Sequence, residues 1–402
     1  MARSRTESTT HGKASIKHAP PKVPGQVVLV LQGGGALGAY QVGVYEALHA
    51  AGIEPDWVIG TSIGAINGAL IASNPPEKRM ERLQAFWAAV EQTSGAAGPA
   101  PWFPDAAIAA TRFWTMLAGI PGFFTPNPFA WFGQHAPVGA EHAAYYTTSP
   151  LRSTLADLVD LDYLNAGNTR ISLGAVKVRN GEMTYFDSRT EAMSIEHILA
   201  SGALPPAFPA VRIKDAFYWD GGIYSNTPLE AVLDDSPRRS SLIFTVDVWN
   251  PDGPEPETLW QVAGREKEIK YASRAKSHIA RQKQIHHLRH VILELTRAMP
   301  QKLRQSPAVR ELASWGCKTT MHVVPLLASG ISGDDQMKDI DFTAAGILIR
   351  RQAGYADTCR MLELSPWNRP MDSIEGIVVH EDLKPGGTRV AAGVDGFLGK
   401  TR

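Results

Sequence analysis

The stretch VVLVLQGGGALGAYQVG, residues 27–43, holds the strongest indication of the fold. An apolar run from Val27 to Leu31 predicts a strand buried on both faces, and the spacing Gly33-x-Gly35-x-x-Gly38 follows it directly. Apolar residues then recur at helical spacing up to about Gly52. The spacing is that of a dinucleotide-binding turn, but the same backbone N–H groups could also serve another negative charge.

A second unit of strand, turn and helix favours the other interpretation. Trp57 to Ile59 predict a short strand, and Gly60-Thr61-Ser62-Ile63-Gly64 follows it. Gly-x-Ser-x-Gly is the pattern of a nucleophile elbow, in which a serine occupies a tight turn before a helix. In a parallel sheet adjacent strands end at one edge, so Gly33 to Gly35 can approach Ser62. Their N–H groups, with the positive end of the following helix, would stabilise an oxyanion there.

The nearby acidic residues argue against a nucleotide site. A dinucleotide-binding unit carries an Asp or Glu near the carboxyl end of its second strand, where it holds the ribose. Glu54 and Asp56 stand at about the right distance, but both precede the second strand. We expect them at the opposite edge of the sheet. The sequence therefore favours a hydrolase, with an NAD-dependent dehydrogenase as the alternative.

A serine nucleophile also needs a proton acceptor, and one aspartate stands in a suggestive context. Asp220 occurs in Tyr218-Trp219-Asp220-Gly221-Gly222, directly after an apolar stretch. Taken alone, this motif is typical of a β-turn. Its meaning depends on the motifs that accompany it.

Together these motifs resemble the patatin-like phospholipase family over about residues 26–250. The matching motifs are Gly33-Gly34-Gly35-x-x-Gly38, Gly60-Thr61-Ser62-Ile63-Gly64, Ala200-Ser201-x-Ala203-x-Pro205-x-x-Phe208-Pro209, Asp220-Gly221-Gly222 and Asn226-Thr227-Pro228. The resemblance implies Ser62 as nucleophile, Asp220 as base without a histidine, and Gly33, Gly34 and Gly35 as oxyanion hole. It also implies a three-layer α/β/α fold with a mostly parallel central sheet. Many relatives carry Lys or Arg where this chain has Leu37, which leaves the substrate preference open.

Composition limits the partners and cofactors. Lys and Arg together number 40, as do Asp and Glu, so no overall field indicates nucleic acid as a partner. Two cysteines, Cys317 and Cys359, suit a reducing compartment, and no apolar run approaches the ~20 residues that span a bilayer. His286-His287-x-x-His290 lacks further ligands at zinc spacing. We expect no metal, no cofactor, and a cytoplasmic protein whose membrane contact, if any, is peripheral.

The chain divides into regions of different character. We expect a disordered basic tail over residues 1–24, a catalytic domain over 25–250, a mostly helical extension over 251–365 and an irregular tail over 366–402. Such an extension resembles that of bacterial members of the family. Within 95–150, nine Phe and Trp residues between Trp102 and Phe132 predict either a lid for an acyl chain or a lobe that buries its own aromatics.

A long helical stretch over 257–298 is rich in positive charge. Between Arg265 and Arg289 it carries eight Lys and Arg against two Glu. This predicts a solvated helical face or, alternatively, attraction to anionic lipid headgroups.

The motifs and the resemblance predict a serine lipid acyl hydrolase that works through an acyl-enzyme. An esterase, a lipase or a storage-polyester depolymerase with the same dyad is one alternative. A Ser–Asp–His triad is another, because His322 and His380 follow in chain order. A non-catalytic adaptor at a membrane is the alternative from a different class. The sequence leaves the oligomeric state open.

Overall fold

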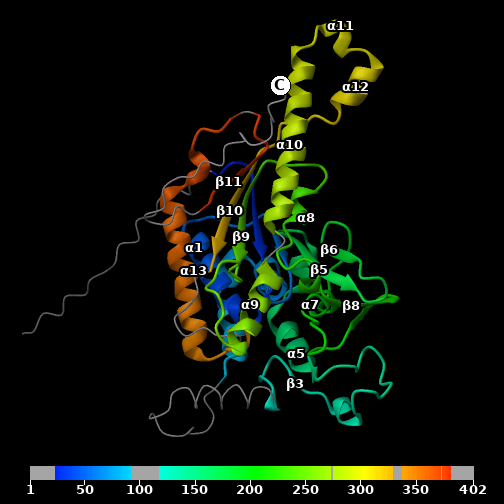
Figure 1. Cartoon of the computed structure of the whole chain (residues 1–402), viewed down its shortest axis with the longest axis vertical. Coiled ribbons are helices and arrows are strands. Elements are labelled where there is room, and N and C mark those ends of the chain that lie inside the picture. Colours follow the sequence, from blue (N-terminus) through cyan, green and yellow to red (C-terminus); the bar gives the residue numbers. More distant parts are fainter. Residues whose placement is uncertain (1–22, 93–116, 273–274, 329–336, 373, 382–402) are drawn as a thin grey trace, which may run out of the picture.

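The central feature of the computed structural model is a mixed β-sheet with helices on both sides (Figure 1). The structure describes residues 23–92, 117–272, 275–328, 337–372 and 374–381. Within these residues, a nine-stranded sheet has the order β11-β10-β9-β1-β2-β5-β8-β7, with β6 also pairing with β5. The strands are β1 (Gln26–Leu31), β2 (Trp57–Gly60), β5 (Arg170–Lys177), β6 (Met183–Asp187), β7 (Val211–Ile213), β8 (Ala216–Asp220), β9 (Ser241–Asp247), β10 (Met321–Leu327) and β11 (Ile377–Val379).

Strands β11 to β5 run parallel, so their carboxyl ends meet at one edge. Leu31 of β1 is level with Gly60 of β2 and with Val246 of β9. The segments that follow these three strands therefore emerge side by side. Strands β6, β7 and β8 are antiparallel to their neighbours, which makes the sheet mixed. The expected α/β fold with a mostly parallel sheet is confirmed.

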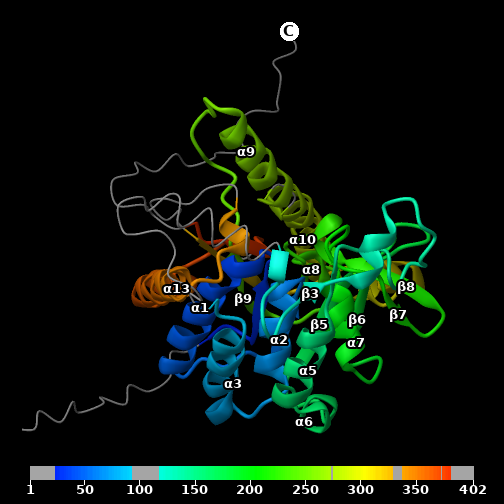
Figure 2. The same cartoon turned by 90° about the horizontal axis from the view of Figure 1, so that it is seen from below.

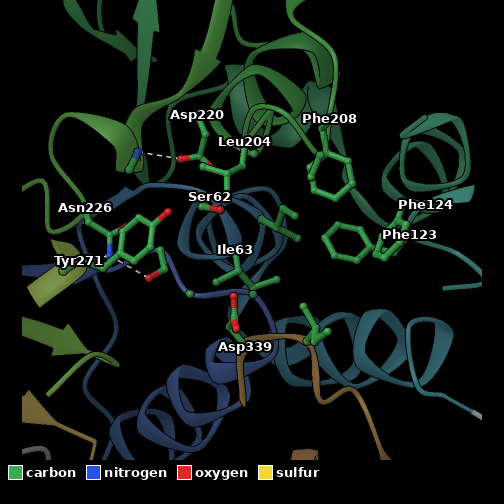
Figure 3. Close-up of a pocket in the computed structure, with 18 of the residues that line it drawn as sticks. Ser62, Ile63, Phe123, Phe124, Leu204, Phe208, Asp220, Asn226, Tyr271 and Asp339 are labelled. Atoms are coloured by element: carbon green, nitrogen blue, oxygen red, sulfur yellow. Dashed lines mark hydrogen bonds between the residues drawn. The ribbon is translucent and has the colours of Figure 1, made fainter. Parts of the chain in front are cut away.

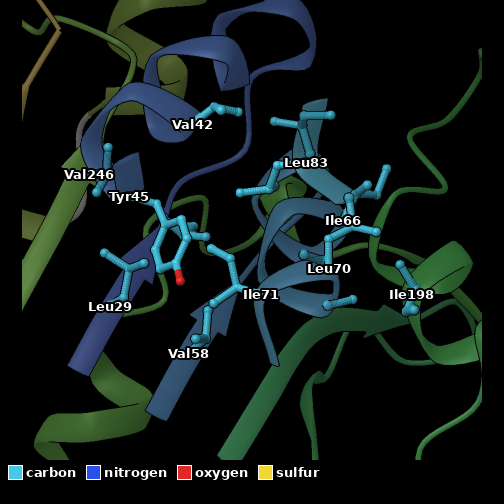
Figure 4. Close-up of a cluster of buried hydrophobic side chains, with 14 of the residues drawn as sticks. Leu29, Val42, Tyr45, Val58, Ile66, Leu70, Ile71, Leu83, Ile198 and Val246 are labelled. Atoms are coloured by element: carbon cyan, nitrogen blue, oxygen red, sulfur yellow. The ribbon is translucent and has the colours of Figure 1, made fainter. Parts of the chain in front are cut away.

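Side chains of β1 alternate between two apolar layers, because successive residues of a strand point to opposite faces. Leu29 packs in the larger cluster, with residues of helices α1, α2 and α13, and Figure 4 shows part of it. Val28 and Val30 pack on the other face, against Leu233 and Ile279. Figure 2 shows the same division: α1, α2, α3 and α13 lie on one side of the sheet and α8 to α10 on the other.

The helices have these bounds. They are α1 (Ala39–Ala50), α2 (Ile63–Ala72), α3 (Pro76–Ala89), α5 (Ser149–Leu158), α6 (Leu161–Asn165), α7 (Ile195–Ser201), α8 (Glu230–Leu233), α9 (Leu259–Ala272), α10 (Ala275–Ala298), α11 (Gln301–Arg304), α12 (Pro307–Ala313) and α13 (Ala344–Leu364). Strands β3 (Thr125–Pro126) and β4 (Tyr146–Thr147) pair antiparallel in a separate two-stranded sheet. Among the described residues, no helix combines the length and apolarity that crossing a bilayer requires.

The C-terminal region is largely helical but is built into the main sheet. Strand β10 pairs with β9, and β11 pairs with β10, so the sheet continues beyond residue 250. The expectation of an irregular tail from residue 366 is wrong at 377–379, because these apolar residues form β11. Helix α13 lies along α1, where Arg351 pairs with Glu46 at 2.8 Å. The expected N-terminal tail falls almost entirely outside the described residues.

Candidate active site

Ser62 occupies a strained turn between β2 and α2. Its backbone has φ 57° and ψ −127°, a region that residues with a Cβ rarely adopt. The Ser62 N–H donates to the Ser201 carbonyl oxygen at 3.0 Å, which helps to hold this geometry. A Cβ on Gly64 would come within 2.3 Å of the Leu31 carbonyl oxygen, so only glycine lets helix α2 begin so close to β1. The turn thus has the features of a nucleophile elbow.

The strand pairing places Asp220 beside this turn. Strand β2 leaves β5 at Leu173, and β8 pairs with β5 from Ala175 onward. Because β6 occupies the other edge of β5 over the same residues, β8 takes the edge that β2 vacates. Asp220, opposite Ala175, therefore lies just beyond the end of β2, where Ser62 emerges. Figure 3 shows both side chains pointing into one cavity.

The Asp220 carboxyl group is almost completely buried, with 1% of the residue exposed. Its Oδ1 accepts a hydrogen bond from the Gly222 amide at 2.7 Å. Its Oδ2 is buried and accepts no standard hydrogen bond from the described residues. Burial raises the pKa of Asp220 to about 7, although the neighbouring Ser62 hydroxyl and the Gly222 amide both lower it. A carboxylate with this pKa is suited to accept a proton near neutral pH.

The three glycines of the first turn differ in what their amides do. The Gly33 N–H donates to the Asn226 carbonyl oxygen at 3.2 Å. The prediction that all three glycines supply N–H groups is therefore wrong for Gly33, whose amide is already used. Among the described residues, no partner is found for the N–H groups of Gly34 and Gly35. Gly33 instead permits close packing, because a Cβ there would lie 2.9 Å from the Cβ of Ser62.

A cavity of about 300 Å³ opens at Ser62 and Asp220. Most of its wall is apolar, and the aromatic side chains Phe123, Phe124, Phe208 and Phe342 form one side of it. Phe123 and Phe124 come from the aromatic segment predicted as either a lid or a lobe that buries its own aromatics, and these two residues line the cavity. Trp131 and Phe132 of the same segment are exposed. Its first four aromatic residues lie outside the described residues.

Several cavity residues come from parts of the chain that carry no functional motif. Trp249 follows β9, Tyr271 lies in the last turn of α9, and Asp339 lies in the short 3-10 helix η4 (Lys338–Ile340). Lys267 pairs with Asp339 at 2.6 Å and so ties α9 to η4 at the cavity. Their positions depend on tertiary packing, and no local motif indicates them.

The acidic residues of the dinucleotide interpretation are far from the glycine turn. Asp56 accepts a hydrogen bond from the Val27 amide at 2.7 Å, at the start of β1. Glu54 pairs with Arg79 at 2.6 Å. Both carboxylates are engaged at the amino ends of the strands, as expected from their place in the sequence. The geometry therefore gives no support to a ribose-binding role.

His322 and His380, the histidines of the triad alternative, lie at the edge of the sheet opposite to Ser62. His322 is level with Leu242 of β9, which in turn is level with Val27 of β1. Four residues of strand separate Val27 from Leu31, or about 13 Å at ~3.3 Å per residue. His380 lies beside His322, with 3.0 Å between Nδ1 of His322 and Nε2 of His380. Within the described part of the chain, no group of three or more His, Cys, Asp or Glu side chains could hold a metal ion.

Comparisons with known proteins fit this geometry. Residues 29–233, just over half of the chain, match the family model described as "Patatin-like phospholipase", and residues 269–373 match one described as "Patatin phospholipase". Lysophospholipase nte1 of Aspergillus terreus is 65% identical over 46 residues, 11% of this chain and 3% of that protein. The human patatin-like phospholipase domain-containing protein 6 is 45% identical over 62 residues, 15% of this chain and 4% of that protein. The chain thus matches only a small part of these longer relatives.

A solved structure, VipD from Legionella pneumophila, aligns over 84% of this chain and 67% of its own. The sequence identity is 15% and the TM-score is 0.35.

Proposed function

Because this chain belongs to the patatin-like phospholipase family, we propose that it is a serine hydrolase that cleaves carboxylic ester bonds of phospholipids or related acyl lipids. The observation that carries the proposal is the meeting of Ser62, on a strained turn, with the buried Asp220 carboxyl in an apolar cavity. An acyl chain would occupy the aromatic side of this cavity and present its ester carbonyl to Ser62.

In the first half of the reaction, Asp220 takes the hydroxyl proton of Ser62 as Oγ attacks the ester carbonyl carbon. The carbonyl π electrons move to oxygen, and the N–H groups of Gly34 and Gly35 stabilise this oxyanion. Collapse of the tetrahedral intermediate breaks the bond to the alcohol oxygen, which receives the proton from Asp220. The products are an acyl-enzyme on Ser62 and a free alcohol.

In the second half, water attacks the acyl-enzyme and gives its proton to Asp220. The fatty acid leaves, and the proton returns to Oγ of Ser62. Asp220 can fill this role without a histidine because burial raises its pKa to about 7. None of the described residues that line the cavity is a histidine. The other carboxylate of the lining, Asp339, pairs with Lys267 at 2.6 Å, so Asp220 is the better candidate for the base.

The test is hydrolysis of a p-nitrophenyl ester and labelling by a serine-reactive fluorophosphonate. We expect Ser62→Ala and Asp220→Asn to lose at least ~10³-fold in kcat, with Ser62→Ala unlabelled. Ser153→Ala, on helix α5, is the matched control and should behave as the unchanged protein. Activity retained in either folded dyad variant would overturn the assignment.

A panel of phospholipids, neutral glycerides and polyester oligomers separates the proposed substrate class from an esterase or a storage-polyester depolymerase. All three kinds of enzyme would use the same dyad, so the rates with the different esters depend on how well each ester fills the cavity. An adaptor without catalytic activity predicts no turnover of any ester.

We further propose peripheral contact with lipid surfaces through exposed aromatic side chains. Trp131 and Phe132, in the 3-10 helix η2 (Pro128–Phe132), are 88% and 71% exposed. They follow β3, whose chain continues directly from the cavity residues Phe123 and Phe124. Aromatic side chains of this kind insert at membrane interfaces.

The basic stretch over 257–298 supports this contact less well. Arg265 pairs with Glu268 at 3.0 Å, Lys267 with Asp339 at 2.6 Å, and Lys283 with Glu375 at 3.5 Å. We expect Trp131→Ser with Phe132→Ser to reduce sedimentation with phosphatidylcholine vesicles. Leu312→Ser, on helix α12 at the far end of the molecule (Figure 1), should leave it unchanged. Equal binding by both variants would argue against this surface.

A further inference from the structure

Trp249 lines the cavity and also contacts the glycine turn. It follows β9 by two residues, and only 2% of it is exposed. Its Nε1–H donates to the Gly33 carbonyl oxygen at 2.8 Å, and the Nδ2 group of Asn226 donates to the same oxygen at 3.0 Å. We propose that Trp249 is a positioning residue that orients the oxyanion hole. The inference rests on the proposed function, because it concerns the same site.

The argument depends on the rigidity of one peptide group. The peptide bond between Gly33 and Gly34 is trans, so its C=O and N–H lie in one plane and point in opposite directions. Two donors hold the Gly33 carbonyl on one side. The Gly34 N–H is therefore directed away from Trp249 and Asn226, and it has no partner among the described residues. Because Gly34 lines the cavity, this N–H is available to a substrate oxygen.

The indole is itself held from several directions. The Trp249 amide donates to Oε1 of Gln32 at 2.9 Å, which fixes the backbone. The ring of Tyr271 packs against the indole, with 5.3 Å between ring centroids. The ammonium groups of Lys267 and Lys338 lie 5.7 and 5.6 Å from the indole centroid, within the range of a cation–π interaction. An indole held in this way can fix the orientation of the Gly33–Gly34 peptide group to which it donates.

The hydrogen bond acts on the transition state more than on the bound substrate. A misplaced Gly34 N–H would still allow an acyl chain to enter the apolar cavity, so KM should change little. Loss of a complete oxyanion donor costs ~10²–10³-fold in kcat. Removal of the indole N–H leaves the Asn226 bond in place, so we expect a smaller loss, of roughly 10- to 100-fold.

The first test is Trp249→Phe, which keeps an aromatic ring but removes the donor. We expect kcat to fall with KM nearly unchanged. Binding of a trifluoromethyl ketone, which forms a tetrahedral adduct with Ser62, should weaken by the same factor. The matched control is Trp367→Phe, because Trp367 is also buried and its Nε1–H has no partner among the described residues. This control should retain wild-type kcat and inhibitor affinity.

A second variant distinguishes the loss of the N–H donor from a general loss of packing. Replacement of Trp249 by β-(3-benzothienyl)alanine substitutes sulfur for N–H and preserves the ring shape. The same fall in kcat and in inhibitor affinity, with an unchanged melting temperature, would support positioning. Wild-type kinetics in this variant would overturn it. If the unchanged protein hydrolyses no ester and fluorophosphonate does not label Ser62, the proposed function itself fails.

Discussion

The buried Asp220 carboxyl should make the folded protein less stable whenever it is ionised. Its pKa rises from 3.8 to about 7, with burial as the largest cause. At ~1.4 kcal/mol per pKa unit, the fully ionised group costs the folded state about 4 kcal/mol. Replacement by Asn removes this cost while keeping an oxygen that can accept the Gly222 hydrogen bond. We therefore expect Asp220→Asn to stabilise the protein as it inactivates it.

The sign follows from proton linkage. Below pH 3.8 Asp220 is protonated in both the folded and the unfolded states, so its burial carries no cost of ionisation. Between 3.8 and about 7, unfolding releases the proton, so the free energy of unfolding falls as pH rises. Above about 7 the loss is complete. The stabilisation by Asn should therefore increase across this window and then remain constant.

The assay is urea unfolding of both proteins between about pH 5 and about pH 8. The difference in free energy of unfolding should grow by about 3 kcal/mol over this range. Asp187→Asn provides a contrast, because hydrogen bonds from Arg170 and Ser172 outweigh burial and lower the pKa of Asp187. That variant should be destabilised. A difference between wild type and Asp220→Asn that does not vary with pH would refute the raised pKa.

Three further predictions concern the same site. The value of kcat/KM should rise with pH until Asp220 is ionised at about 7, and a rate profile with its midpoint near the ordinary carboxyl range would contradict its role as base. Gly35→Ala should lower ester hydrolysis by at least ~10²-fold, because Gly35 has φ 55° and a Cβ would lie 2.3 Å from the Asp339 carbonyl oxygen. Gly181→Ala is its control, since that hairpin glycine has φ 70° but open space around it, and equal losses would point to backbone strain alone. His322→Ala should retain full activity in the p-nitrophenyl ester assay, and a large loss would revive the triad.

The sequence predicted the parts of the site that depend on local order. Ser62 and Asp220 both lie where an apolar strand ends near glycine, and a motif of a few residues is enough to identify such a junction. The parallel arrangement of the first two strands followed from the alternation of strand and helix. That arrangement places the glycine turn beside Ser62, whereas Asp220 reaches Ser62 only because the antiparallel strand β8 pairs with β5 beyond the end of β2.

The remaining features depend on pairing between distant segments. The Gly33 amide is used by the Asn226 carbonyl oxygen, and a backbone carbonyl carries no side-chain signature. Trp249 lies just after an apolar strand and belongs to no motif in the sequence, and its N–H contacts Gly33 only when β9 pairs with β1. The short strand β11 was missed because three apolar residues in a polar region give too little periodicity.

The position of β1 in the sheet has a consequence for biosynthesis. One edge of β1 pairs with β2 soon after it in the chain, but the other edge pairs with β9, where Gln26 and Ser241 are 215 residues apart. At ~5–20 residues per second, a ribosome needs about 10 to 40 s to make that interval. Throughout this time the nascent chain carries an apolar strand with one open edge, the kind of surface that recruits other chains. A strand inside the finished sheet thus keeps an open edge until most of the chain has been made.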